Sequence, residues 1–69
     1  MYKEIGKRIK DVRRECGLSQ AQFGEKLSVS QDTVSLWENG RSAPNAELII
    51  AIAKTFDVSA DFLLGLKEY

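Results

Sequence analysis

Apolar residues recur every three or four positions along most of this chain, which is the spacing of amphipathic α-helices. Capping and turn residues interrupt the spacing, and Gly17, Gly40 and Gly65 fall where helices are expected to end. We therefore predict an all-α fold in one small domain, residues 1–69. The expected helices lie at about residues 3–15, 20–27, 31–39, 46–56 and 60–64.

The apolar face of each helix supplies the predicted core. In the first helix this face includes Cys16, which follows Val12 by four positions, so we expect Cys16 to be a buried structural thiol. The other predicted core residues are Ile5, Ile9, Phe23, Leu27, Val34, Trp37, Leu48, Ile49, Ile52, Ala53, Phe56, Phe62 and Leu63.

The segment 18–40 carries the most information about function. Ser19 is a good N-cap for the helix at 20–27, and Gln22 completes a capping box. Ser30 caps the next helix, and Asp32 adds a favourable negative charge to its first turn. Two short helices joined by a tight turn form a helix-turn-helix, a motif that fits the major groove of DNA.

The second of these helices has two distinct faces. At about 100° per residue, Val34 and Trp37 fall on one side and form its core face. Short polar side chains on the other side, near an exposed helix N-terminus, suit hydrogen bonds to base edges. From this pattern alone, an ordinary solvated face is an equal alternative. The outward residues are Gln31, Asp32, Ser35, Leu36 and Asn39.

The charge balance argues against DNA, because the chain holds ten basic and ten acidic residues and its isoelectric point is about 6.2. The charges are distributed unevenly, however. Residues 1–14 hold six basic and two acidic residues, and the rest of the chain is acidic on balance. A positive face remains compatible with this distribution, and we expect modest nonspecific affinity for DNA with strong salt dependence.

The residue inventory excludes several classes of function. The chain has no histidine for general-base work and a single cysteine, so we expect no catalytic site, no metal, no cofactor and no internal disulfide. No phosphate-binding glycine motif is present in the sequence. Met1 leads into charged, amphipathic sequence and the longest apolar run, 48–53, is too short to span a bilayer, so we expect a cytoplasmic protein.

Three stretches in order, IGKRIKDVRRECGLSQAQFGEKL, VSQDTVSLWENGRSAPNAELIIAIAKTF and DVSADFLLG, resemble the phage repressor/Cro-type helix-turn-helix family, also called the xenobiotic-response-element family. The resemblance covers residues 5–64. It implies a compact five-helix, lambda-repressor-like DNA-binding domain with its helix-turn-helix at the second and third helices. It also implies a sequence-specific transcriptional regulator, a repressor, that reads double-stranded DNA.

The resemblance places Gln31 at a base-reading position, and an amide can make two hydrogen bonds to adenine. Asp32 either accepts from cytosine N4 or is only a helix-start charge. An exposed Leu36 suits a thymine methyl group. The predicted base-reading residues are Gln31, Asp32, Ser35 and Leu36.

A second set is expected to contact phosphates and so to position the domain. By resemblance, Gln20 contacts a phosphate at the N-terminus of its helix. Ser19 adds a contact or is simply the cap, and both roles are compatible. The predicted phosphate contacts are Ser19, Gln20, Thr33, Asn39 and Arg41.

The resemblance also implies features that stabilise the fold. Arg13 is expected to form a partly buried ion pair with Glu38. Ser28 occupies a turn position where the family usually has glycine, so we predict a positive φ there. Gly24 is expected to let the helix at 31–39 approach closely.

An alternative function is a protein-binding regulator, of the antitoxin type or a partner-sensing type. The neutral charge agrees with it, and Leu64, Leu66 and Tyr69 are candidate exposed apolar residues, although packing on the first helix or fraying explains them equally well. The same end of the family's fold often makes a dimer contact. We therefore expect a homodimer on a palindromic operator, with half-sites about one helical turn apart.

Overall fold

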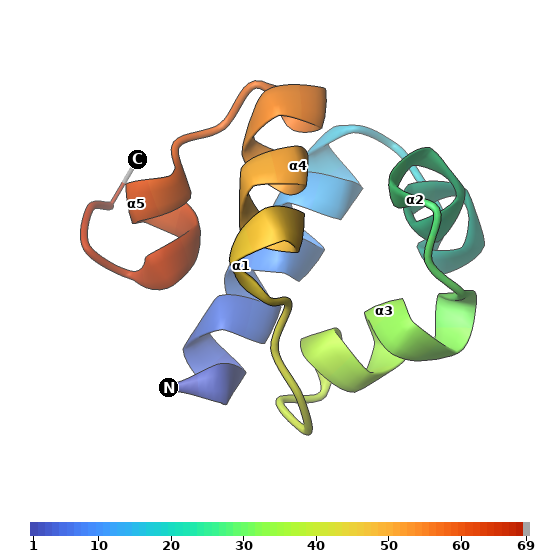
Figure 1. Ribbon diagram of the computed structural model, residues 1–69, viewed down its shortest axis with the longest axis horizontal. Helices are drawn as coiled ribbons and strands as arrows, with labels where there is room; N and C mark the ends of the chain where they lie inside the picture. The colour runs from blue at the N-terminus through green and yellow to red at the C-terminus, as the bar shows by residue number, and fades with distance from the viewer. Residues whose placement is uncertain (69) are drawn as a thin grey trace.

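The computed structural model describes residues 1–68 and shows five α-helices over that range (Figure 1). No strand occurs among these residues, so the predicted all-α fold is confirmed. Tyr69 lies outside the described residues. The helices are α1 (Tyr2–Glu15), α2 (Gln20–Leu27), α3 (Gln31–Glu38), α4 (Ala46–Phe56) and α5 (Ala60–Leu64).

Four of the helices begin at a side-chain cap. The capping oxygens of Ser19, Ser30, Asn45 and Ser59 each accept a hydrogen bond from a backbone N–H in the first turn. These caps satisfy N–H groups that the helices cannot pair internally, which explains why such short helices begin at these residues.

The core lies where the five helices meet, and each of them contributes at least one buried hydrophobic residue. Phe23 of α2 stacks on Phe56 of α4, with ring centroids 4.5 Å apart and planes inclined by 7°. In Figure 1, α4 lies in front of α1, with α2 and α3 on one side and α5 on the other. The helix-turn-helix therefore packs against one side of these two helices, with α3 in contact with α1 and α2 in contact with α4. The buried hydrophobic residues are Ile5, Ile9, Val12, Phe23, Leu27, Val34, Trp37, Ile49, Ile52 and Leu63.

Two glycines permit close approach between elements. A Cβ on Gly6 would lie 2.0 Å from the carbonyl oxygen of Trp37, so α1 and the end of α3 touch through their backbones. A Cβ on Gly24 would lie 2.6 Å from the carbonyl oxygen of Val29 and 3.3 Å from Cγ2 of Val34. The expected close approach at Gly24 is therefore present, and it involves the turn as well as α3.

The prediction of a buried Cys16 is wrong, because its side chain is exposed. Cys16 is the C-cap of α1 and not part of its apolar face. The chain then turns at Gly17, whose φ is +69°, so α1 ends at Glu15 and the Cys16 thiol lies at the surface beyond its apolar face.

The turn between α2 and α3 has the predicted left-handed residue. Ser28 has φ 60° and ψ 36° at the C-cap of α2. Asp57 is the other non-glycine residue with positive φ among residues 1–68, at the C-cap of α4. None of the described helices is both long enough and apolar enough to cross a membrane.

Candidate nucleic-acid interface

The helix α3 presents a polar face outward and anchors its opposite face in the core. Val34 and Trp37 are almost completely buried. On the other side, Gln31, Asp32 and Leu36 are exposed, and Leu36 retains 43% of its accessible surface. A rigid helix with an exposed, mostly polar face has the form of an element that can enter a groove.

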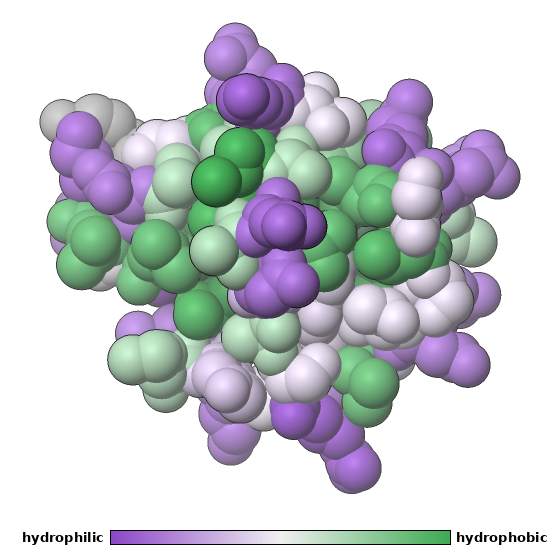
Figure 2. Space-filling model, in the orientation of Figure 1, coloured by the Kyte–Doolittle hydropathy of each residue, from purple (hydrophilic) through white to green (hydrophobic). Residues whose placement is uncertain are grey.

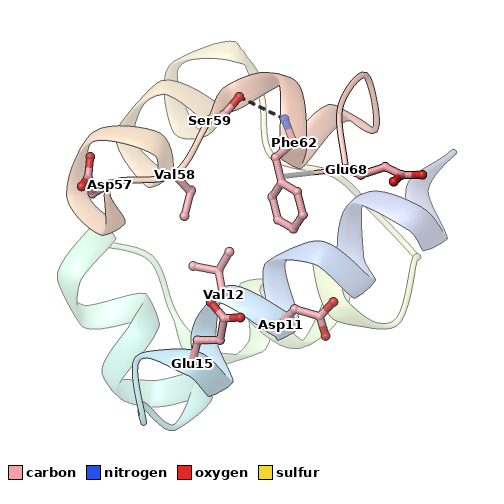
Figure 3. A pocket seen from close by; sticks show the side chains of 8 residues that line it. All are labelled: Asp11, Val12, Glu15, Asp57, Val58, Ser59, Phe62 and Glu68. Carbon is pink, nitrogen blue, oxygen red and sulfur yellow. Dashed lines mark hydrogen bonds between the residues drawn. The ribbon is translucent and has the colours of Figure 1, made fainter.

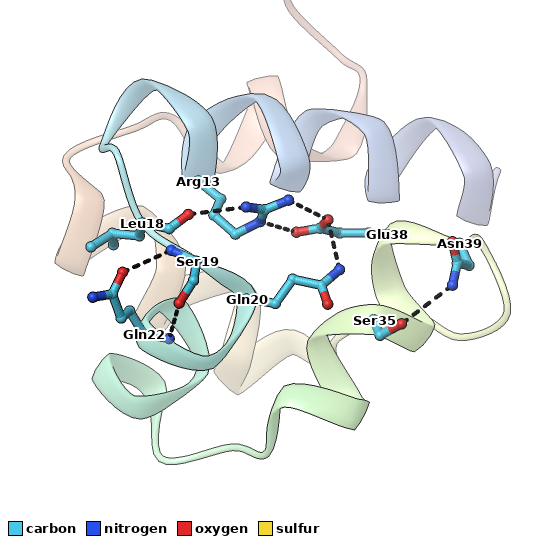
Figure 4. Close-up of polar contacts among 8 residues, drawn as sticks. All are labelled: Arg13, Leu18, Ser19, Gln20, Gln22, Ser35, Glu38 and Asn39. Atoms are coloured by element: carbon cyan, nitrogen blue, oxygen red, sulfur yellow. Dashed lines mark hydrogen bonds and ion pairs between the residues drawn. The ribbon is translucent and has the colours of Figure 1, made fainter.

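Local hydrogen bonds order both ends of this face. At its start, the Ser30 hydroxyl accepts from the Thr33 backbone N–H at 3.1 Å and lies 3.0 Å from the Thr33 hydroxyl. At its end, the Asn39 amide donates to the Ser35 hydroxyl at 3.3 Å (Figure 4). Thr33 and Ser35 are half-buried and Asn39 is exposed, so the polar atoms stay at the surface.

Arg41 follows α3 at an exposed position. Its backbone N–H donates to the carbonyl of Leu36 at 3.0 Å, which fixes the chain against the last turn of the helix. The Arg41 backbone is therefore held against the last turn of α3, and its side chain is exposed.

At the start of α2, Ser19 forms the predicted capping box. Its hydroxyl accepts from the Gln22 backbone N–H at 3.1 Å, and the Gln22 side-chain oxygen accepts from the Ser19 backbone N–H at 2.8 Å (Figure 4). The role of Ser19 as a cap is thus present in the free protein.

Arg13 and Glu38 form the ion pair that the resemblance implies, and it links α1 to the last turn of α3 (Figure 4). Arg13 Nε donates to Oε2 of Glu38 at 2.7 Å, and Nη2 donates to Oε1 at 2.9 Å. Arg13 Nη1 donates to the carbonyl of Leu18 at 3.0 Å. Only 3% of the Glu38 side chain is exposed, against 13% for Arg13. This two-bond geometry is the strong form of an arginine–carboxylate contact.

Gln20 completes this network, which sequence reasoning missed. Its Nε2 donates to Oε1 of Glu38 at 3.1 Å, across 18 residues of sequence (Figure 4). The spacing of residues in the sequence does not predict this contact, because it depends on the angle between α2 and α3. The first turn of α2, the end of α3 and α1 therefore meet at one carboxylate.

The network holds Glu38 ionised. Burial raises the pKa of its carboxyl, but the hydrogen bonds from Arg13 and Gln20, with the positive charges of Arg13 and Lys10, outweigh burial and lower the pKa below its usual range. The hydrogen bond to Glu38 correspondingly raises the pKa of Arg13. The negative charge of Glu38 at the end of α3 is thus balanced within the protein by Arg13.

Comparisons with known proteins agree with this architecture. A family model described as helix-turn-helix matches residues 9–63. The chain is 33% identical to the P22 c2 repressor protein, crystallised in complex with synthetic operator 9T in the presence of Tl+, with a TM-score of 0.84 over 91% of this chain and 96% of that one.

Two curated relatives are similar over most of this chain. The transcriptional regulator ImmR of Bacillus subtilis is 31% identical over 93% of this chain and 50% of its own length. Antitoxin PezA of Streptococcus pneumoniae is 38% identical over 88% of this chain and 39% of its own length. The chain thus spans half or less of these relatives. With the family model matching most of its length, the chain belongs to the repressor/Cro (xenobiotic-response-element) type of the helix-turn-helix family.

Proposed function

We propose that this domain is a sequence-specific DNA-binding transcriptional repressor that reads the major groove with α3. The observation that supports this most directly is the contrast between the two faces of α3, with Val34 and Trp37 buried and Gln31, Asp32 and Leu36 exposed. The similarity to a repressor crystallised with a synthetic operator adds support.

In this proposal the outward face of α3 supplies the sequence specificity. The Gln31 amide offers two hydrogen bonds to adenine, and the Leu36 side chain offers apolar contact to a thymine methyl group. Asp32 accepts from cytosine N4, and the half-buried Ser35 lies in the same face. The proposed base-reading residues are Gln31, Asp32, Ser35 and Leu36.

The flanking residues contact the phosphate backbone and position α3. Gln20 donates one N–H to Glu38 and retains a second N–H for a phosphate oxygen. Arg41 supplies a positive charge just beyond the C-terminal end of α3. The proposed phosphate contacts are Ser19, Gln20, Thr33, Asn39 and Arg41.

We further propose that the domain binds a palindromic operator as a homodimer. Ile50, Leu64 and Leu66 are large hydrophobic residues that remain exposed, at 52%, 44% and 72% of their accessible surface. Figure 2 shows apolar surface over α4 and α5, divided by hydrophilic side chains that lie across the middle of the view. Apolar surface of this kind is typical of protein contacts.

The second candidate is a protein-binding regulator of the antitoxin type. Two observations favour it: the similarity to antitoxin PezA, and a formal net charge of zero, which weakens the general attraction to DNA.

Selection from a random duplex library at low salt tests the proposal. The protein is incubated with the library, bound duplexes are sequenced, and Trp37 fluorescence verifies that the protein is folded. An enriched palindrome supports a dimeric reader of DNA. A folded protein that enriches no sequence contradicts the proposal and favours the protein-binding candidate.

A further inference from the structure

A groove between α1 and the α4–α5 end of the molecule is separate from the proposed DNA-reading face (Figure 3). Its volume is about 390 Å³, which lies within the range of about 300–1,000 Å³ that is usual for ligand pockets. Val12 of α1, Val58 of the α4–α5 loop and Phe62 of α5 form its apolar floor, and Figure 3 shows their side chains pointing toward one another.

The rim of this groove is acidic. Asp11 and Glu15 line it from α1, Asp57 lies at the end of α4, and Glu68 follows α5. No lysine or arginine is among the residues that line this groove within the described range 1–68. Four carboxylates around an apolar floor favour a ligand that carries positive charge and one apolar group.

The charge changes along the groove. A second hollow on the far side of Phe62 shares Asp11 and Glu68 with the first, and adds Lys7 and Arg8 together with Glu4. The Arg8 guanidinium lies over the Phe62 ring, 5.7 Å from its centroid. The end near Asp57 is therefore the acidic one, which gives a bound cationic segment a preferred direction.

The position of the groove leaves it accessible when α3 is engaged. One side of α1 holds α3, through the contact of Gly6 with Trp37 and the pair of Arg13 with Glu38. The groove uses other residues of α1, and in Figure 1 α5 lies on the opposite side of α4 from α2 and α3. Four of the ten acidic residues that balance the ten basic ones therefore line this groove, away from the proposed DNA face.

We propose that the α1–α5 groove is a docking site for a cationic peptide segment of a partner protein, with one apolar side chain on the floor and basic residues against the rim. The carboxylates attract and orient the segment, but exposed ion pairs contribute little binding free energy in water. Burial of the apolar side chain against Val12, Val58 and Phe62 supplies most of the affinity. Both features are needed for recognition.

Titration of the labelled protein with defined probes, followed by amide chemical shifts, tests this proposal. The probe is the blocked peptide Lys-Arg-Leu-Lys-Arg, and the matched controls are the same peptide with Ser in place of Leu, and spermidine. We expect saturable shifts at Val12, Val58 and Phe62 with the leucine peptide and much weaker ones with both controls.

Paired variants test the role of the rim. Asp11→Asn with Glu15→Gln removes two carboxylates of the groove and should weaken peptide binding about 2- to 30-fold, as expected for two exposed charge pairs. Glu25→Gln with Glu47→Gln removes two exposed carboxylates elsewhere and should leave peptide binding unchanged. Binding of both variants to a selected DNA duplex separates this proposal from the proposed function, because neither pair belongs to the DNA-reading face.

Three results would overturn the proposal. The first is the absence of saturable shifts with the leucine peptide, and the second is equal shifts with the serine peptide or spermidine, which would mean a merely acidic surface. The third is the same set of shifts appearing with protein concentration alone, which would mean that a second copy of the chain occupies the groove.

Discussion

At the scale of single residues, Ser28 shows how one backbone conformation limits stability. Its φ of 60° and ψ of 36° are left-handed, a conformation that costs a residue with a Cβ about 1–2 kcal/mol. We expect Ser28→Gly to raise the free energy of unfolding by about 0.5–1 kcal/mol, because glycine removes this cost but is more flexible when unfolded.

Urea denaturation of Ser28→Gly measures this effect, with Asp57→Gly as the matched control. Asp57 has φ 54°, but aspartate tolerates the left-handed region better than serine, so its gain should be smaller. If Ser28→Gly is no more stable than wild type, the left-handed conformation of Ser28 does not lower the free energy of unfolding.

The buried carboxylate of Glu38 is the second residue with a large expected effect. Glu38→Gln leaves the Arg13 guanidinium without its counter-charge, and we expect a loss of about 2–4 kcal/mol of unfolding free energy at neutral pH. The exposed pair of Asp61 and Lys67, at 3.8 Å, provides the control, and Asp61→Asn should cost less than about 1 kcal/mol.

The pH dependence of stability follows from the lowered pKa of Glu38 in the folded state. The contribution of Glu38 is complete above the unfolded pKa of about 4.3 and is lost as the pH falls through the folded value. Thermal melts below this pH should therefore show a steeper loss of stability for wild type than for Glu38→Gln. Parallel curves for the two proteins would indicate that the ion pair contributes nothing to folding.

Residue roles were only partly predictable from sequence. The left-handed Ser28 and the pairing of Arg13 with Glu38 were predicted from the family resemblance, which marks both positions. The contact of Gln20 with Glu38 was not, because it joins residues 18 apart through the packing of two helices. The exposed Cys16 was predicted wrongly, since helical spacing does not reveal whether a neighbour covers the end of a helix.

At the scale of elements, the approach of α1 to α3 depends on Gly6. A Cβ there would meet the Trp37 carbonyl oxygen at 2.0 Å, and a backbone atom cannot move aside cheaply. We expect Gly6→Ala to destabilise the domain by about 2–3 kcal/mol, although alanine is otherwise the better helix former.

Gly24→Ala is the comparison within the helix-turn-helix. Its Cβ would lie farther, 2.6 Å, from the nearest oxygen, so urea denaturation should show a smaller loss than for Gly6→Ala. The reverse order would mean that the contact between α1 and α3 relaxes more easily than the turn.

The helices themselves were predictable, because caps and apolar spacing are local signals. The close approach at Gly6 was not, because it depends on how two helices pack.

At the scale of the whole molecule, the neutral total charge hides an uneven distribution. Glu38 is paired internally and four carboxylates line the groove on the α5 side, which together make five of the ten acidic residues. We expect Arg41→Ala to weaken binding to all duplexes alike and to reduce the salt slope of binding by about one. Fluorescence anisotropy over a series of salt concentrations measures that slope, and an unchanged slope would remove Arg41 from the phosphate contacts.

Duplex selection with wild type and Gln31→Ala in parallel tests whether α3 reads DNA sequence. We predict that the mutant shifts one base position in each half-site and loses about 1–3 kcal/mol of binding free energy at the wild-type site. If wild type and mutant select the same sequences with the same affinity, Gln31 reads no base, and its assignment as a base-reading residue at the start of α3 is contradicted.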